Sequence, residues 1–210
     1  MNGKRNGKGI EYDKGELKFV GEYLNGLLLT GRGYDINGMP YQINNGNGKI
    51  KEYNKNGELE FEGEYLNGVR NGKGKEYNDY NGKLLFEGEY LNGLRNGYGK
   101  EYYYSGKIEF EGEYLNGKRW NGKGYKNNNI TYELKNGNGF VKEYNKYGKL
   151  EFEGEYLNGE RNGKGKEYDY EYGKLLFEGE YLNGKRNGKG KEYNKYGELK
   201  FEGEYLNGER

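Results

Sequence analysis

Short stretches in which apolar and acidic residues alternate recur along the whole chain. In residues 58–65 every second residue is glutamate, and the residues between them are Leu59, Phe61, Gly63 and Tyr65. Alternation with a period of two over seven or eight residues predicts a β-strand with one buried face. Asn-Gly pairs at 67–68 and 71–72 supply turn residues, because both residue types accept positive φ at low cost.

A second short strand is predicted from residue 74 to residue 77, and the Asn-Gly pair at 81–82 ends it. The unit is therefore a hairpin of two antiparallel strands. Helices are not expected, because glycine recurs every few residues and no stripe with a period of 3.6 is present. Gly74 and Tyr77 are three residues apart and cannot share a face of a regular strand. Either a β-bulge separates them or Tyr77 points outward.

The hairpin motif recurs seven times as nearly the same eight residues. FEGEYLNG occurs six times and FVGEYLNG once. The copies begin at Phe19, Phe61, Phe86, Phe110, Phe152, Phe177 and Phe201. Successive starts lie 42, 25, 24, 42, 25 and 24 residues apart, so the spacing itself repeats. A period in this range indicates that each unit is one supersecondary element that buries its apolar face against its neighbours.

Each gap of 42 residues contains one shortened hairpin, near 39–60 and near 130–151. Aligned on the Lys-Glu-Tyr motif of the second strand, two bulky residues replace the glycines at 63 and 74. They are Tyr41 and Ile50 in the first shortened hairpin, and Tyr132 and Val141 in the second. Two glycines lost together for two bulky residues predict that the exchanged pair face each other across the hairpin.

These observations predict an all-β chain whose residues 1–210 form a single repeat domain of nine strand pairs. We expect adjacent hairpins to share one continuous hydrogen-bonded sheet that is elongated, antiparallel, twisted and open at both ends. Open terminal strands are templates for pairing with another copy, so end-to-end self-association is also predicted.

Composition removes several classes of protein. The net charge is +1, from 35 basic and 34 acidic residues, so no bulk field attracts nucleic acid, and nucleic acid is not an expected partner. The absence of cysteine excludes disulfides. No apolar run approaches the roughly 18 residues that span a bilayer, and the first residues contain no signal-peptide apolar region.

The residues that enzymes use are scarce in this chain. There is no histidine and no cysteine, Ser105 is the sole serine, and threonine occurs only at Thr30 and Thr131. Imidazole bases and zinc sites of the usual kind therefore have no ligands. The Gly-x-Gly strings do not lead from a strand into a helix, as a phosphate loop requires. We predict no enzymatic activity, no metal site and no cofactor.

The repeated sequence resembles the MORN repeat (membrane occupation and recognition nexus), whose pattern is aromatic, Gly-Glu, aromatic, Asn-Gly and then Gly-x-Gly. The matching residues in one unit are Phe61, Gly63, Glu64, Tyr65, Asn67, Gly68, Gly72 and Gly74. The resemblance implies sheets of hairpins that serve as scaffolds, dimerising modules or membrane-proximal binding modules. It therefore implies a non-enzymatic scaffold with protein partners, located in the cytoplasm and associated with a membrane or the cytoskeleton. Where the family often has tryptophan and histidine, this chain has tyrosine and asparagine.

Two charged rows follow the repeat. The first consists of glutamates in the strands: Glu62, Glu64, Glu87, Glu89, Glu111, Glu113, Glu153, Glu155, Glu178 and Glu180. They either form a solvated face paired with lysines of the neighbouring strands, or line a groove for a cation or a basic peptide. The lysines in question are Lys75, Lys100, Lys166 and Lys191.

The second row consists of arginines near the turns: Arg5, Arg70, Arg95, Arg119, Arg161 and Arg186. If successive hairpins stack in register, these arginines lie along one edge. They either keep the turns soluble or present an edge to anions. The second interpretation gives the alternative function, a peripheral module that binds anionic phospholipid membranes, since each basic residue near such a surface contributes about 1 kcal/mol.

Two irregular turns are candidate anchors for a protein partner. Leu27, Leu28 and Leu29 occupy a turn that elsewhere reads Val-Arg or Leu-Arg, and Trp120 occupies the matching turn 91 residues later. An apolar turn with no folding role is a candidate partner anchor. The alternative is that each turn packs on the neighbouring shortened hairpin.

Overall fold

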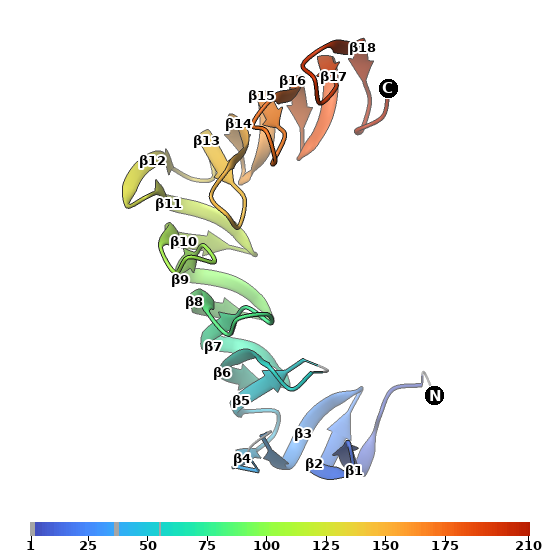
Figure 1. Cartoon of the computed structure of the whole chain (residues 1–210). Coiled ribbons are helices and arrows are strands. Elements are labelled where there is room, and N and C mark those ends of the chain that lie inside the picture. Colours follow the sequence, from blue (N-terminus) through green and yellow to red (C-terminus); the bar gives the residue numbers. More distant parts are fainter. Residues whose placement is uncertain (1–2, 36–37, 55) are drawn as a thin grey trace. The chain divides into compact units, whose positions relative to one another are not determined.

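A computed structural model describes residues 3–35, 38–54 and 56–210. In these residues the chain forms eighteen β-strands and no helix (Figure 1). The predicted domain also includes residues 1, 2, 36, 37 and 55, which lie outside the described residues. The all-β fold built from antiparallel hairpins is confirmed.

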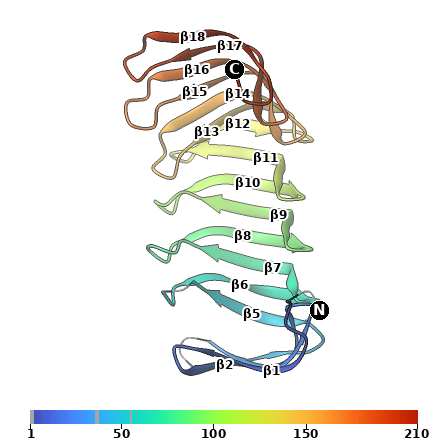
Figure 2. The same cartoon turned by 90° about the vertical axis from the view of Figure 1, so that its right-hand side faces the viewer.

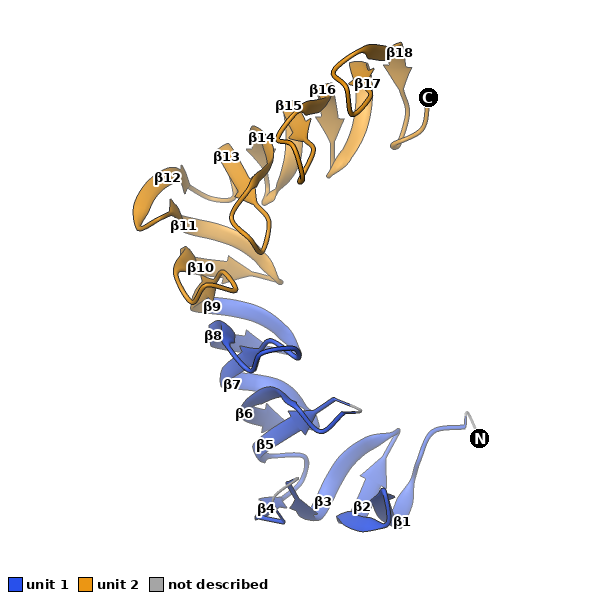
Figure 3. Ribbon diagram, in the orientation of Figure 1, with its two compact units in different colours: residues 1–97 blue, residues 98–210 orange. Residues whose placement is uncertain are grey.

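The chain divides into two compact units, residues 1–97 and 98–210 (Figure 3). Both units are built from the same hairpins, and a single repeat domain over residues 1–210 stays a prediction. Unit 1 contains β1 (Gly7–Asp13), β2 (Glu16–Leu24), β3 (Leu27–Tyr34), β4 (Pro40–Ile43), β5 (Gly48–Tyr53), β6 (Leu59–Leu66), β7 (Val69–Tyr77) and β8 (Leu84–Leu91). The boundary between the units falls within β9 (Leu94–Tyr102).

Unit 2 contains β10 (Ile108–Leu115), β11 (Lys118–Lys126), β12 (Asn129–Leu134), β13 (Gly139–Tyr144), β14 (Leu150–Leu157), β15 (Glu160–Tyr168), β16 (Leu175–Leu182), β17 (Lys185–Tyr193) and β18 (Leu199–Tyr205). Within each sheet consecutive strands lie side by side in chain order, as Figure 2 shows for β14 to β18. The sheets are open.

The Asn67-Gly68 pair forms the hairpin turn, as predicted. The turn predicted at Asn71-Gly72 is wrong, because these residues lie inside β7. In the turn between β6 and β7, Asn67 has φ 52° and Gly68 has φ 77°, and Leu66 pairs with Val69. Positive φ at both central residues is the type I′ turn, whose twist matches that of the two strands. Tyr77 points outward, which is the second of the two predicted alternatives, because its hydroxyl donates to Glu62 on the side of the sheet opposite Phe61. The register shift between Glu76 and Tyr77 leaves its extra residue, Leu85, on β8.

The expectation of one continuous sheet is wrong. In unit 1, β4 and β5 belong to different sheets and are joined by an isolated bridge between Asn44 and Asn47. In unit 2, β12 and β13 part in the same way beyond the bridge between Lys135 and Asn138. Both interruptions fall in the shortened hairpins.

The predicted pairing of Tyr41 with Ile50 is wrong as well. Tyr41 pairs with Gly33 of β3, and Ile50 pairs with Gly63 of β6. The register places Tyr41 where regular hairpins have phenylalanine, and it places Ile43 where they have glycine. The sequence alignment was therefore two residues out of step in β4. The second shortened hairpin repeats this arrangement, with Tyr132 opposite Gly124, Leu134 opposite Gly122 and Val141 opposite Gly154.

The core is a row of aromatic rings on a bed of glycines, which we call the Phe face. In a regular hairpin two glycines face each other across the strands, such as Gly154 and Gly165. The ring of Phe152 covers both, and a Cβ atom added to either glycine would lie 2.6 Å from it. Phe152 is fully buried although the sheet is a single layer. Glycine is therefore required at both positions, because any side chain there would overlap the Phe152 ring.

Tyrosines complete the Phe face between the phenylalanines. The Tyr181 ring lies 5.3 Å from the Phe152 ring and 5.6 Å from the Phe177 ring, both in edge-to-face geometry. Tyr205 continues the row at 5.2 Å from Phe177. Edge-to-face pairs stabilise by about 0.5–1.5 kcal/mol beyond their buried area. Each hairpin thus contributes to the core of the next.

Candidate functional site

The arginines of the predicted anion edge lie on the Phe face. In unit 2 the Arg161 guanidinium carbon is 4.0 Å from the centre of the Phe152 ring. The guanidinium also donates two hydrogen bonds to the carboxylate of Glu143, from Nε at 2.8 Å and from Nη2 at 2.7 Å. The flat face of the guanidinium thus lies against the Phe152 ring, and its edge binds the Glu143 carboxylate. Both contacts favour the cation.

The same arrangement recurs in both units. Each guanidinium lies over a phenylalanine and pairs with the glutamate of a Lys-Glu-Tyr motif 18 or 19 residues earlier, or its equivalent. In unit 1, Arg70 pairs with Glu52 and Glu76, and Arg95 pairs with Glu76; in unit 2, Arg119 pairs with Glu101 and Glu109, Arg161 with Glu143 and Glu167, and Arg186 with Glu167. These arginine side chains are 23–28% exposed.

Tyrosine hydroxyl groups complete the coordination of these carboxylates. The Tyr181 hydroxyl donates to Glu167 at 2.7 Å, and the Tyr90 hydroxyl donates to Glu76 at 2.6 Å. Burial raises the pKa of Glu167, but the hydrogen bonds from Arg186 and Tyr181 outweigh it, so the pKa lies below its ordinary value. Burial and the bond to Glu167 both raise the pKa of Tyr181. We call these repeated contacts of arginine, glutamate and tyrosine on the Phe face the ladder. Its hydrogen bonds favour ionised glutamate and neutral tyrosine.

Arg5 is the most exposed of the six predicted edge residues. Its side chain is 61% exposed, and it forms an ion pair with Glu11 at 2.7 Å. All six arginines of the predicted edge therefore have a carboxylate partner. The sequence predicts the row at a turn edge, and it gives no sign that the guanidinium groups lie over phenylalanine rings and pair with glutamates.

The four candidate anchor residues were expected in turns, but Leu27, Leu28 and Leu29 begin β3 and Trp120 lies in β11. They contact the shortened hairpins. The Leu29 carbonyl accepts a hydrogen bond from the Gly46 amide, and the Trp120 carbonyl accepts one from the Gly137 amide at 2.7 Å. The Trp120 ring lies against Gly137, where an added Cβ would be 2.8 Å from it. Leu28 packs on the cluster formed by Phe19, Tyr23, Ile43 and Ile50, while Leu27 is 42% exposed.

The opposite side of the sheet, which we call the Glu–Lys face, carries the glutamate row. Register pairs Glu153 with Lys166, and Lys166 with Glu178. Ion pairs join Lys191 to Glu202 at 3.3 Å and Lys142 to Glu153 at 3.4 Å. The predicted cross-strand pairing of glutamate with lysine is thus present.

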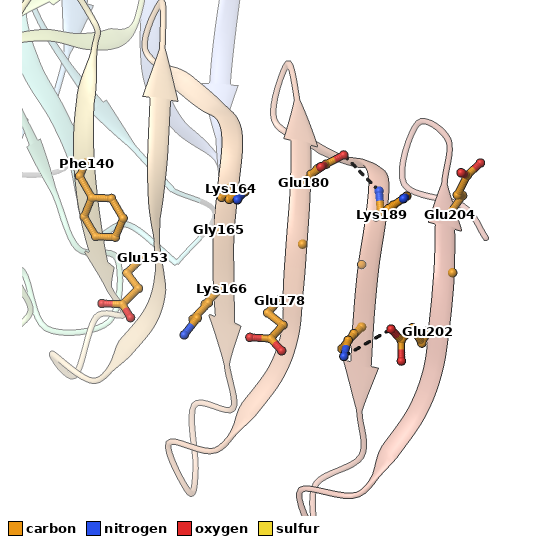
Figure 4. A pocket seen from close by; sticks show the side chains of 14 residues that line it. Phe140, Glu153, Lys164, Gly165, Lys166, Glu178, Glu180, Lys189, Glu202 and Glu204 are labelled. Atoms are coloured by element: carbon orange, nitrogen blue, oxygen red, sulfur yellow. Dashed lines mark hydrogen bonds and ion pairs between the residues drawn. The ribbon is translucent and has the colours of Figure 1, made fainter.

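A groove of about 560 Å³ crosses β13 to β18 on the Glu–Lys face (Figure 4). Its floor is the backbone at Gly165, Gly179, Gly190 and Gly203, and its walls are glutamate and lysine side chains on either side of these glycines. Phe140, which is 56% exposed, closes one end. The described residues contain no group of three or more His, Cys, Asp or Glu side chains placed to hold a metal ion.

Sequence reasoning missed a third surface, the tyrosine loops of unit 2. They are the loops 145–149, 169–174 and 194–198, which join the strands at the end opposite the Asn-Gly turns. Their tyrosines are strongly exposed: Tyr147 72%, Tyr170 61%, Tyr172 64% and Tyr196 67%. The available signal was the position of these tyrosines, which lie outside the period-two pattern of the strands.

Side chains cap the backbone of the tyrosine loops. The Asn145 carboxamide oxygen accepts the amides of Tyr147 and Lys149, each at 3.0 Å. Asp169 caps the second loop in the same way. The Lys149 ammonium donates to the Glu171 carbonyl at 2.9 Å, which ties the first loop to the second. These side chain-to-backbone bonds fix the turns that carry the tyrosines.

Comparison with protein families identifies the hairpins. The MORN repeat model matches residues 1–16, 61–82, 86–108, 152–173 and 177–195. The last four stretches begin at the phenylalanines of regular hairpins, and the shortened hairpins lie outside the matched stretches. No curated protein matches the chain. In the described part of the chain, no helix has the length and apolar character needed to cross a membrane.

MORN repeats are in general modules that interact with proteins or membranes, and the family is non-enzymatic. The glycine bed, the covering phenylalanine and the Asn-Gly turn are the physical content of the matched pattern in this chain. The chain belongs to the MORN-repeat family.

Proposed function

We propose that the chain is a non-enzymatic scaffold that binds protein partners through the tyrosine loops of unit 2. The observation that carries this proposal is the combination of exposed rings and capped turns. Tyr147, Tyr172 and Tyr196 are 64–72% exposed. Such exposure contributes little burial to the fold, while the side-chain caps fix the backbone turns that carry the rings.

Exposed tyrosines on capped polar loops are suited to recognition of proteins. Tyrosine supplies a large contact area and a hydroxyl group at a low cost in side-chain entropy, and asparagine and glycine supply the turns around it. Lys146 and Lys195 lie beside these rings, each with its ammonium 5.2 Å from the neighbouring tyrosine ring. The loops therefore suit a partner surface that has hydrogen-bonding groups and acidic residues.

The lipid-binding alternative has weaker support. It requires arginines free to meet phosphate groups, whereas the guanidinium of Arg161 already has two hydrogen bonds to Glu143. Transfer to a phosphate would leave that carboxylate without its strongest partner. Strong co-sedimentation with phosphatidylserine vesicles at low salt, abolished by charge reversal at Arg70, Arg95, Arg161 and Arg186, would favour the alternative over our proposal.

The test compares partners recovered by matched variants from an extract of the cells that produce the protein. The first variant carries Tyr147→Ser, Tyr172→Ser and Tyr196→Ser. The control carries Leu157→Ser, Leu182→Ser and Leu206→Ser, which are 47%, 48% and 70% exposed at the opposite ends of the same strands. We expect specific partners on the wild type and the control and at least a tenfold loss on the tyrosine variant. Equal recovery on all three contradicts the proposed surface.

Two further predictions from the sequence stay proposals. Leu27, Leu28, Leu29 and Trp120 are candidate anchors, and a Leu27→Asn variant in the same recovery experiment tests the most exposed of the leucines. End-to-end self-association through terminal strands is tested by sedimentation of the full chain. A monomer at the highest soluble concentration would rule it out.

A further inference from the structure

The Glu–Lys face of unit 2 is striped, because each strand carries one sign of charge. β15 carries Lys164 and Lys166, and β16 carries Glu178 and Glu180. The alternation continues with lysines on β17 and glutamates on β18; these residues are Lys189, Lys191, Glu202 and Glu204. Figure 4 shows the stripes side by side. Since neighbouring strands are about 4.8 Å apart, the sign changes over that distance.

The Glu–Lys face of unit 2 is not flat. The two side chains of each strand stand on either side of a glycine, as Lys164 and Lys166 do around Gly165. Two ridges of charged side chains therefore run across the strands, with the 560 Å³ groove between them. A surface of this shape accepts a ridge of matching width.

We infer that a second copy of the chain docks on this face, with a ridge of one copy in the groove of the other. A striped surface is complementary to itself, because a displacement by one strand places each lysine stripe over a glutamate stripe. A polyanion such as a nucleic acid does not fit, because every lysine pair is followed by a glutamate pair. This inference goes beyond the proposed function and does not depend on the tyrosine loops.

The size of the face predicts weak association. Six strands about 4.8 Å apart, each contributing roughly 20 Å of length, give on the order of 600 Å² per copy. The total of about 1,200 Å² is at the lower limit of specific interfaces. Phe140 adds one exposed ring at the end of the groove. The dimer should therefore be reversible and sensitive to salt.

The test uses sedimentation velocity of the full chain and two neutralised variants. One carries Lys164→Gln, Lys166→Gln, Lys189→Gln and Lys191→Gln, and the other carries Glu178→Gln, Glu180→Gln, Glu202→Gln and Glu204→Gln. Glutamine still has the oxygen that accepts the Lys189 amide at residue 180, and the one that accepts the Tyr193 hydroxyl at residue 178. Both variants should therefore fold, as circular dichroism will check.

We expect the wild type to dimerise at about 0.01 M ionic strength and to dissociate at about 1 M, where the screening length falls from about 30 Å to about 3 Å. Each variant alone should associate at least tenfold more weakly, and an equimolar mixture should regain dimers, because an anionic face then meets a cationic one. A control with Lys14→Gln, Lys83→Gln, Lys107→Gln and Lys135→Gln, all outside the groove, should dimerise like the wild type.

Three results would overturn the inference. They are a monomeric wild type at low salt, dimers that survive in both neutralised variants, and a mixture that stays monomeric. The second result would indicate association elsewhere, such as end to end. None of these results affects the recovery experiment on the tyrosine loops, so the two proposals fail independently.

Discussion

The regular hairpin β6–β7 and the shortened hairpin β4–β5 differ in the residues at which their two strands meet. In β6–β7, Gly63 faces Gly74 and the Phe61 ring covers both. In β4–β5 the equivalent positions hold Ile43 and Ile50, which are 0% and 6% exposed, and the strands part. A buried apolar surface alone therefore does not keep a hairpin closed in this chain. The glycine pair does so, because it lets one ring cover both strands.

The shortened hairpins keep their turn edge while the strands separate. The Gly46 carbonyl accepts the Gly68 amide at 2.9 Å, and the Gly137 carbonyl accepts the Gly159 amide at 2.9 Å. The ladder of turns is therefore continuous across each interruption within its unit. In each unit the two strands of the shortened hairpin are therefore joined at their turn and separate beyond it.

Removal of a covering ring should have the largest effect. Phe177→Ala deletes a fully buried ring that contacts Tyr181 and Tyr205. We expect a loss of about 3–5 kcal/mol in the free energy of unfolding, measured with urea. Tyr41→Ala removes a partly buried ring over a single glycine in the shortened hairpin, so its loss should be clearly smaller. Equal losses would remove the distinction between the two kinds of hairpin.

A side chain in the glycine bed should come next. Gly165→Val places its Cβ about where the Phe152 ring lies, since an ideal Cβ is 2.6 Å from that ring. Overpacking of this kind costs about 1–3 kcal/mol. The double variant with Phe152→Leu should lose less than the sum of the single changes, because the smaller side chain makes room. Additive losses would show that the Phe152 ring is not what excludes a side chain at residue 165.

Loss of a guanidinium should cost somewhat less. Arg161→Met keeps an apolar side chain over Phe152 but leaves the half-buried Glu143 without its bidentate partner. We expect a loss of about 1–2 kcal/mol. Burial raises the pKa of Glu143, and the hydrogen bond from Arg161 lowers it below its ordinary value. In the variant, Glu143 should therefore titrate at a higher pH than in the wild type, as measured by NMR. Addition of Glu143→Gln should recover part of the stability; no recovery would mean that the ion pair is incidental.

Alkaline pH should have the smallest effect per residue. Burial and the hydrogen bond to Glu153 raise the pKa of Tyr168 to about 12, against an unfolded value near 10. A raised folded pKa gives stability that is fully present below pH 10 and is lost as pH rises through about 12. Urea unfolding from pH 9 to about 12 should show this decline, and Tyr168→Phe should reduce it. A decline that is unchanged in the variant would assign it to other groups.

Acid acts with the opposite sign on the carboxylates that pair with arginines on the Phe face. The pKa of Glu76 and of Glu167 lies below the ordinary value, because arginine and tyrosine hydrogen bonds outweigh burial. Their contribution is present above the unfolded pKa and is lost as pH falls through the folded one. Stability should therefore be greatest between the two limits.

The strands and turns could be predicted from sequence because their signals are local. Alternation around Phe61 and the pair Asn67-Gly68 each act within a few residues, and both predictions are confirmed. The break after Ile43 could not be predicted, because an alignment by letters placed Tyr41 on a glycine instead of on the phenylalanine. Only the pairing with β3 shows that Tyr41 covers Gly33.

The arginine row shows why site geometry is harder to predict. Arg161 was assigned to a turn edge because its neighbours are Asn-Gly pairs. Its partner Glu143 is 18 residues earlier, on the preceding hairpin, and no pattern within one hairpin reveals it. A search for Glu and Arg at this repeated separation would have found the ladder. The tyrosine loops are hard to predict because Tyr147 and Tyr196 lie between the strands, where the period-two pattern does not extend.

Backbone hydrogen exchange in unit 1, measured by NMR, tests the central contrast most directly. We expect amides of β4 and β5 on the sides where these strands part to exchange quickly, and amides that join β6 to β7 to be protected. Protection should be restored toward Gly46 and Gly68, where the turn ladder continues. Uniform slow exchange across residues 40–53 and 59–77 would show that the shortened hairpin is closed and would contradict the role assigned to the glycine pair.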